Sequence, residues 1–90
     1  MDIKEASKFF EQNELGKAKE MLDQLILENP TDVQLLLLRG RIFYKMQKWG
    51  EAMNDYNSVL QMEPKNAEAN SGIEMARNIL GYFTPDMFNP

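Results

Sequence analysis

The amino-acid sequence predicts an all-α protein in which five antiparallel helices stack as a helical solenoid. Helical periodicity is one reason, because apolar residues recur three and four positions apart in five successive segments. The chain also matches itself at an offset of 34 residues, at which Pro30 is followed by Pro64. Repeats of this length form stacked helical pairs, because each pair buries its apolar face against its neighbours.

Residues of matching size and character are paired by this offset. Small residues fall on small residues at three places, and aromatic residues fall on aromatic residues at two. Such positions mark close contacts between helices, so their recurrence at one offset indicates a repeated helical hairpin. The pairs are Ala6 with Gly40, Phe9 with Phe43, Phe10 with Tyr44, Gly16 with Gly50, Ala18 with Ala52, and Pro30 with Pro64.

The first hairpin is predicted at residues 2–12 and 15–28, separated by a polar break. In its second segment, Ala18, Leu22 and Leu25 have the spacing of a half-buried helix. That helix ends before Pro30, because proline cannot continue the hydrogen-bond ladder and restricts the residue before it.

The central hairpin is predicted to begin with a capping box from Thr31 to Gln34, in which the threonine hydroxyl accepts from a backbone N–H of the first turn. Its first helix runs to residue 46 and is apolar nearly all round, as expected of a helix with neighbours on both sides. Its second helix spans residues 49–62 and ends before Pro64.

A fifth helix, at residues 67–81, is predicted to cap the stack, because only one of its faces is apolar. We therefore expect a domain at residues 1–81, with repeats at 1–30 and 31–64 and a capping helix at 66–81, followed by a tail at 82–90. The apolar face of the fifth helix is Ala69, Ile73, Ala76 and Leu80, and the polar face is Asn70, Glu74 and Arg77.

At these residues the chain resembles the tetratricopeptide repeat (TPR) family, whose 34-residue pattern has a small and an aromatic residue in the first helix, an alanine in the second and a closing proline. The resemblance implies a right-handed superhelix whose concave face is lined by the first helix of each repeat, and a role in protein–protein interaction. The central repeat matches the pattern at Leu36, Gly40, Phe43, Ala52, Tyr56 and Pro64, and the first repeat at Ala6, Phe9, Ala18, Leu22 and Pro30.

Composition argues against several classes of function. A net charge of −4 opposes binding to nucleic acid, which requires clustered basic residues. The longest apolar run, residues 35–38, is too short to span a membrane, and the charged N-terminus lacks a signal-peptide pattern. We therefore expect a cytoplasmic protein with no nucleic-acid and no membrane partner.

No enzyme, metal site or cofactor is predicted. The chain has no histidine and no cysteine, which removes the usual nucleophile–base pairs and the imidazole and thiolate ligands. Its five glycines are scattered, so no phosphate-binding loop is indicated. Acidic pairs such as Glu11 with Glu14 fall at helix ends, where solvated charge is the usual explanation.

The predicted partner-binding surface is the concave face, assigned by carrying the family's positions onto this chain. On an acidic chain it gathers Lys4, Arg41 and Lys45, together with leucines and aromatic residues that lack a further repeat to bury them. An apolar floor edged by cations suits a peptide that brings hydrophobic anchors and a carboxylate. The predicted residues are Lys4, Ser7, Phe10, Gln34, Leu37, Leu38, Arg41, Tyr44, Lys45 and Met75.

Structural explanations compete with this assignment. Arg41 and Lys45 could simply solvate a helix face. Arg39, where the family usually has leucine, is predicted to face the first repeat and to pair with a carboxylate such as Glu5. The family's carboxylate clamp for acidic chaperone tails is ruled out, because its basic and amide positions are here Ile3, Ser7, Leu38, Glu68 and Gly72.

The function predicted is a small non-enzymatic scaffold or adaptor that binds a peptide or a partner helix on its concave face. The alternative is a self-associating structural protein that uses exposed leucines and the tail, and the expected state is a monomer or a weak homodimer. The tail holds three aromatic residues, a methionine and two prolines. We expect it to fold back on the helices through Phe83, although filling a groove of its own or of a neighbouring molecule is the alternative.

Overall fold

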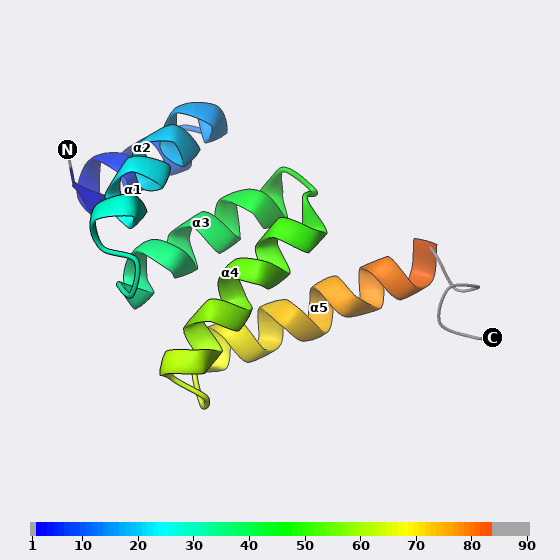
Figure 1. Ribbon diagram of the computed structural model, residues 1–90. Helices are drawn as coiled ribbons and strands as arrows, with labels where there is room; N and C mark the ends of the chain where they lie inside the picture. The colour runs from blue at the N-terminus through cyan, green and yellow to red at the C-terminus, as the bar shows by residue number, and fades with distance from the viewer. Residues whose placement is uncertain (1, 84–90) are drawn as a thin grey trace.

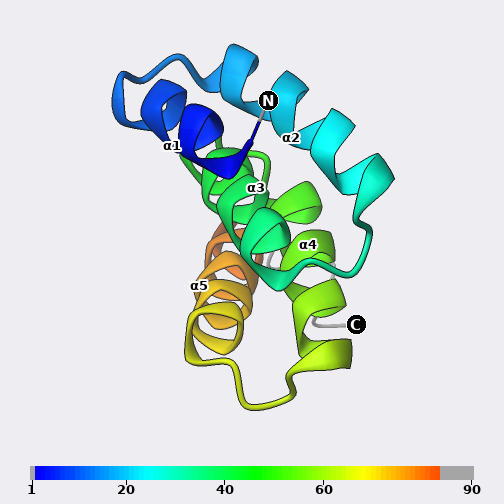
Figure 2. The same ribbon diagram turned by 90° about the vertical axis from the view of Figure 1, so that its left-hand side faces the viewer.

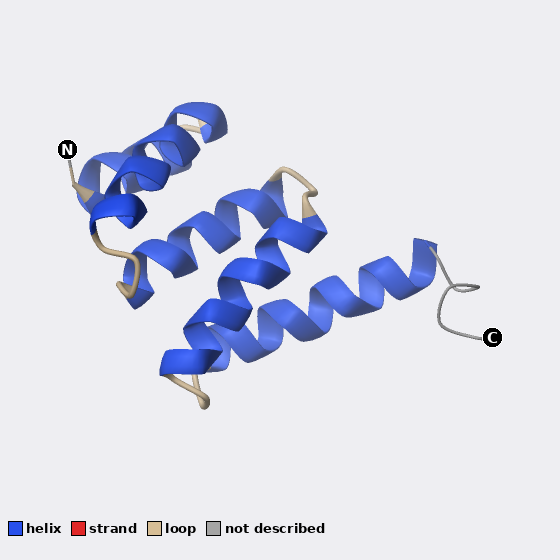
Figure 3. Ribbon diagram, in the orientation of Figure 1, coloured by secondary structure: helices blue, strands red, loops and turns tan. Residues whose placement is uncertain are grey.

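The computed structural model describes residues 2–83, with side chains described for residues 2–81 (Figure 1). Helices account for this whole part of the chain apart from short connections, and it contains no strand (Figure 3). The predicted all-α stack of five helices is confirmed, and α2 and α4 begin and end where the sequence predicts. The helices are α1 (Ile3–Glu11), α2 (Leu15–Glu28), α3 (Val33–Lys45), α4 (Trp49–Met62) and α5 (Ala67–Phe83).

The helices form two layers. Helices α1, α3 and α5 lie on one side of the molecule, and α2 and α4 lie on the other (Figure 2). Each helix packs against the next along the chain, and α3 also contacts both α1 and α5 within its own layer. The resulting body is elongated, 47 × 27 × 20 Å, as expected of a solenoid in which each pair contacts only its neighbours.

The turns within the two hairpins have the same geometry. Asn13 and Gln47 occupy equivalent positions, and each has a φ of 62°, in the left-handed region. The backbone N–H of the following residue donates to the carbonyl oxygen of Phe9 in one turn and of Phe43 in the other, at 2.8 Å in both. This is the Schellman arrangement that ends many helices, and glycine is its usual left-handed residue. The repeat is therefore expressed in the backbone as well as in the sequence.

Helix α3 is capped by Asp32, so the predicted capping box at Thr31 is wrong by one residue. The Asp32 Oδ1 accepts from the backbone N–H groups of Gln34 and Leu35, at 3.0 and 3.3 Å. At the equivalent position before α5, the Asn66 Oδ1 accepts from the first turn at 2.9 Å. Threonine and aspartate both cap helices well, and the carboxylate has the added attraction of the positive helix end.

Helix α3 lies between two hydrophobic clusters. Because the run of four leucines is divided between its two sides, the helix is apolar nearly all round, as the sequence predicts. Leu35, Leu38 and Ile42 pack with α1 and α2, whereas Leu36, Leu37 and Phe43 pack with α4 and α5.

The prediction that Leu37 and Leu38 form an exposed floor is wrong, since they are only 4% and 2% exposed. Neighbouring helices of the same layer cover them. Ala69 and Ile73 of α5 join the cluster of Leu37, and Ala6 of α1 joins the cluster of Leu38. These two leucines therefore do not support the alternative that the protein self-associates through exposed leucines.

Arg39 pairs with two carboxylates of α2 and α4 instead of the predicted Glu5. Its Nε and Nη2 donate to the two carboxylate oxygens of Asp55, each at 2.8 Å, and its Nη1 donates to Asp23 at 2.9 Å. Asp23 also accepts from Lys19 Nζ at 2.6 Å. These hydrogen bonds raise the pKa of the Arg39 guanidinium, Asp55 being the largest cause. The network joins α2, α3 and α4 across the repeat boundary.

The two predicted faces of α5 are confirmed where side chains are described. The four residues of the predicted apolar face are buried or half-buried against the stack, and the three residues of the predicted polar face are exposed. No helix in the described residues is long and apolar enough to cross a membrane. Residues 84–90 and the side chains of Tyr82 and Phe83 lie outside the described part of the chain, so the packing of the tail stays a prediction.

Candidate functional site: a groove between α3 and α5

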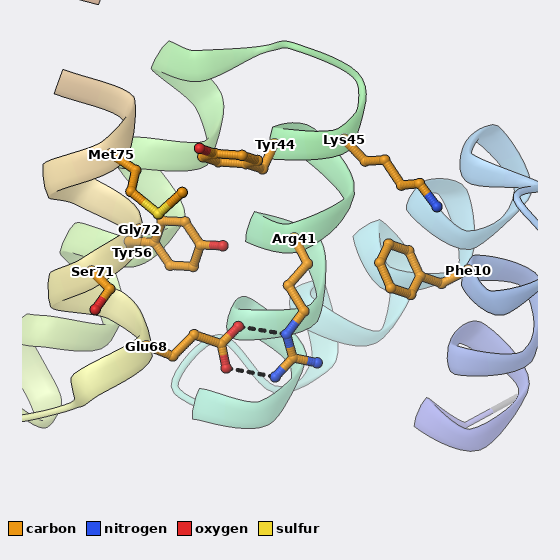
Figure 4. Close-up of a pocket in the computed structure, with 9 residues that line it drawn as sticks. All are labelled: Phe10, Arg41, Tyr44, Lys45, Tyr56, Glu68, Ser71, Gly72 and Met75. Carbon is orange, nitrogen blue, oxygen red and sulfur yellow. Dashed lines mark hydrogen bonds and ion pairs between the residues drawn. The ribbon is translucent and has the colours of Figure 1, made fainter. Parts of the chain in front are cut away.

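A groove of about 370 Å³ opens in the layer formed by α1, α3 and α5 (Figure 4). Helices α3 and α5 supply most of its walls, α1 contributes one aromatic ring, and α4 contributes a tyrosine. The lining residues are Phe10, Arg41, Tyr44, Lys45, Tyr56, Glu68, Ser71, Gly72 and Met75. Five of the ten predicted partner-binding residues meet here, namely Phe10, Arg41, Tyr44, Lys45 and Met75.

The other predicted residues lie elsewhere. Lys4 and Gln34 are exposed and Ser7 is half-buried, and none of these three belongs to the described lining of the groove. Leu37 and Leu38 are core residues, as described above. The groove is thus a smaller site than the concave face predicted from the family, and it is concentrated between α3 and α5.

Tyr56 is a groove residue that the sequence assigned only to the core of the hairpin. Its ring is buried between Gly40 of α3 and Gly72 of α5. A Cβ atom would lie 2.8 Å from the ring at Gly40 and 2.4 Å from it at Gly72, closer than real Cβ atoms approach. Burial raises the pKa of the Tyr56 phenol to about 12, and the Glu68 carboxylate adds to the shift. Three helices therefore meet at one ring, which fixes the base of the groove.

An ion pair joins the two walls of the groove. Arg41 of α3 donates from Nε and Nη2 to the two carboxylate oxygens of Glu68 on α5, at 2.5 and 2.6 Å (Figure 4). This bidentate contact is the main cause of the raised pKa of the Arg41 guanidinium. The side chains remain 43% and 37% exposed. Arg41, which the sequence predicts to bind a carboxylate of a partner, is therefore already paired with a carboxylate of the same chain.

The remaining lining is aromatic and apolar, with one further cation. The Lys45 Nζ lies 5.3 Å from the centroid of the Phe10 ring, on the side of the groove nearest α1 (Figure 4). Tyr44 makes an edge contact with Trp49, with the ring centroids 4.9 Å apart. Met75 is 52% exposed, so its side chain is accessible at the surface of the groove. These groups suit binding of an apolar side chain with a polar neighbour.

Among residues 2–83, no group of three or more acidic side chains is placed to hold a metal ion. Among the described residues that line the groove, Glu68 is the one carboxylate, and Arg41 already holds it. The arrangement can hold a partner by contact and charge.

Comparison with known proteins agrees with the repeat pattern. The chain is 30% identical over 67 residues to a protein of Caenorhabditis elegans named tetratricopeptide repeat protein 21 homolog. The match covers 74% of this chain and 5% of that protein, so this chain spans only a small part of its length. No family model and no solved structure matches the chain. The similarity and the stacked helical hairpins together confirm the predicted resemblance to tetratricopeptide repeat proteins.

Proposed function

We propose that this protein is a non-enzymatic interaction module that binds a peptide or a partner helix in the groove between α3 and α5. The observation that carries the proposal is a groove whose base is fixed by packing and whose rim is exposed. Gly40 and Gly72 hold the Tyr56 ring in place, while Met75 and Tyr44 remain accessible above it. A preformed site binds well because little conformational freedom is lost when the partner arrives.

The size of the groove indicates what it can hold. A volume of about 370 Å³ is near the lower end of the range for ligand sites, so it accommodates a few side chains and not a whole domain. Methionine adapts its shape to different partners, which suits Met75 to this role. Similarity to a tetratricopeptide repeat protein supports a protein–protein role over an enzymatic one.

The test compares two variants in which glutamate replaces an exposed methionine. Met75→Glu places a charge in the groove, whereas Met62→Glu places the same charge on another exposed methionine, at the end of α4. Proteins retained from an extract by the wild type and by Met62→Glu, but not by Met75→Glu, are candidate partners. Each candidate is then purified, and its direct affinity for the three proteins is measured by calorimetry.

Circular dichroism confirms that each variant is folded before the affinities are compared. We expect direct binding that Met75→Glu weakens at least tenfold, because a buried contact near the centre of an interface is worth more than about 1.4 kcal/mol. Equal affinity of Met75→Glu and wild type for every purified partner would contradict the assignment of the groove.

A further inference from the structure

We infer that the Glu68 carboxylate occupies the position on Arg41 that a carboxylate of the partner takes when the partner binds. The groove then selects a segment that carries an acidic residue close to a large apolar side chain, and this segment must displace Glu68 from Arg41. The inference rests on the proposed function and specifies the chemistry of the segment that is bound.

The first argument is the geometry of the ion pair. The Arg41 guanidinium receives a carboxylate with two parallel hydrogen bonds, which is the arrangement that makes arginine selective for carboxylates. The site for a carboxylate is therefore already formed in the lining of the groove, with Tyr56 and Ser71 in the same lining. A peptide carboxylate could occupy the same position without any change in the Arg41 side chain.

The second argument is accessibility. The Arg39–Asp55 pair of the same helix is closed off, because Asp55 is buried, whereas both members of the Arg41–Glu68 pair are more than one-third exposed. Exposed ion pairs are weak, since water competes for both charges. Glu68 can therefore be exchanged for another carboxylate at little cost, and Asp55 cannot.

The third argument is the charge of the lining. In the part of the chain that the structure describes, the lining contains two cations, Arg41 and Lys45, and one carboxylate, on a chain with a net charge of −4. Lys45 is exposed, with its ammonium group directed toward the Phe10 ring (Figure 4). This local positive excess favours an acidic segment over a basic one. The exposed Met75 and the ring of Tyr44 supply the surface for its apolar side chain.

The experiment uses two matched pools of short random peptides, each with one fixed phenylalanine. In one pool the other positions include aspartate and glutamate, and in the second pool asparagine and glutamine replace them. Binding of each fluorescent pool to the full chain is followed by anisotropy. We expect the acidic pool to bind more tightly than the amide pool, and Arg41→Gln to remove this preference.

The decisive variant is Glu68→Gln, which removes the internal competitor. It should strengthen binding of the acidic pool about fivefold and leave the amide pool unchanged, because Arg41 is then available in most molecules. Glu74→Gln is the matched control, since it makes the same change of charge on an exposed residue of α5 that lines a separate surface with Asn70 and Arg77. It should change neither affinity.

Three results would overturn the inference. Equal binding of the two pools to the wild type would show that the groove does not select a carboxylate, although peptide binding itself would stand. Weaker or unchanged binding of the acidic pool to Glu68→Gln would show that Glu68 does not compete. Binding of neither pool would also overturn the inference, and the proposed function would then be decided by the Met75→Glu comparison alone.

Discussion

Replacement of Arg39 by leucine, the residue usual at this position in the TPR family, should destabilise this protein strongly. Arg39→Leu removes both hydrogen bonds to Asp55, whose side chain is only 5% exposed, and leaves a buried carboxylate without its partner. Breaking a buried pair in this way costs about 3 to 5 kcal/mol, and we expect about 3 kcal/mol because the guanidinium is partly exposed. A domain of 90 residues has a total free energy of unfolding of roughly 5 to 13 kcal/mol. The variant should therefore lose about a quarter or more of its stability.

Urea unfolding followed by circular dichroism measures this loss, and two further variants test its cause. Asp23→Asn removes an outer, more exposed member of the same network and should cost less than about 1 kcal/mol. The double variant Arg39→Leu with Asp55→Met replaces both partners by apolar residues, and methionine already holds the equivalent of position 55 in the first repeat, at Met21. It should recover most of the stability, because replacing both polar partners by apolar groups leaves no buried charge.

Two outcomes would refute this reasoning. A loss below about 1 kcal/mol for Arg39→Leu would mean that water reaches Asp55 and that the network is dispensable. A double variant no more stable than Arg39→Leu would mean that the arginine acts by packing, since its guanidinium carbon lies 5.7 Å from the centroid of the Phe43 ring.

Two further predictions concern Tyr56 and the hairpin turns. The free energy of unfolding should fall by about 2 kcal/mol between pH 10 and pH 12, because the unfolded chain releases the Tyr56 proton near pH 10 while the folded protein keeps it until about pH 12. Urea unfolding across this range should show a shallower slope for Tyr56→Phe, and an unchanged slope would contradict the assigned pKa. Gln47→Gly should raise the free energy of unfolding by about 0.5 to 1 kcal/mol, because glycine adopts its φ of 62° without strain. Asn13→Gly, at the same φ, should gain less because asparagine tolerates this region, and an equal gain in thermal melts would count against the strain argument.

The helices were predictable from the sequence because local information determines them. Pro30 and Pro64 end the second helix of each repeat, and both α2 and α4 end two residues before them. The sequence offers two starts for α3, since Thr31 and Asp32 are adjacent and both can cap. The left-handed φ of Gln47 was not predicted, because this conformation is usually signalled by glycine or asparagine.

The candidate site was only partly predictable, because it depends on how closely helices of the same layer approach. The family's positions placed Arg41, Tyr44 and Met75 on the face that holds the groove. They could not show that α5 covers Leu37 and that α1 covers Leu38. The pairing of Arg41 with Glu68 joins residues 27 apart, one in the central repeat and one in the capping helix, and spacing along the chain does not indicate such a pair. The sequence does contain a signal for the partner of Arg39, because Asp55 is a charged residue beside Tyr56 on the inward stripe of α4.

The two arginines of α3 have separate structural roles, and helix geometry explains why. Residues 39 and 41 are two positions apart, which turns their side chains by about 200° around the helix axis. Arg39 therefore joins α3 to α2 and α4 through a buried carboxylate, while Arg41 faces the groove and holds α5 through an exposed one. Because the exposed pair is the weaker of the two, we expect a partner that enters the groove to change the contact between α3 and α5 and to leave the α2–α3–α4 junction intact. Substitution of Arg39 should accordingly be measured as a loss of stability, and substitution of Arg41 as a change in binding.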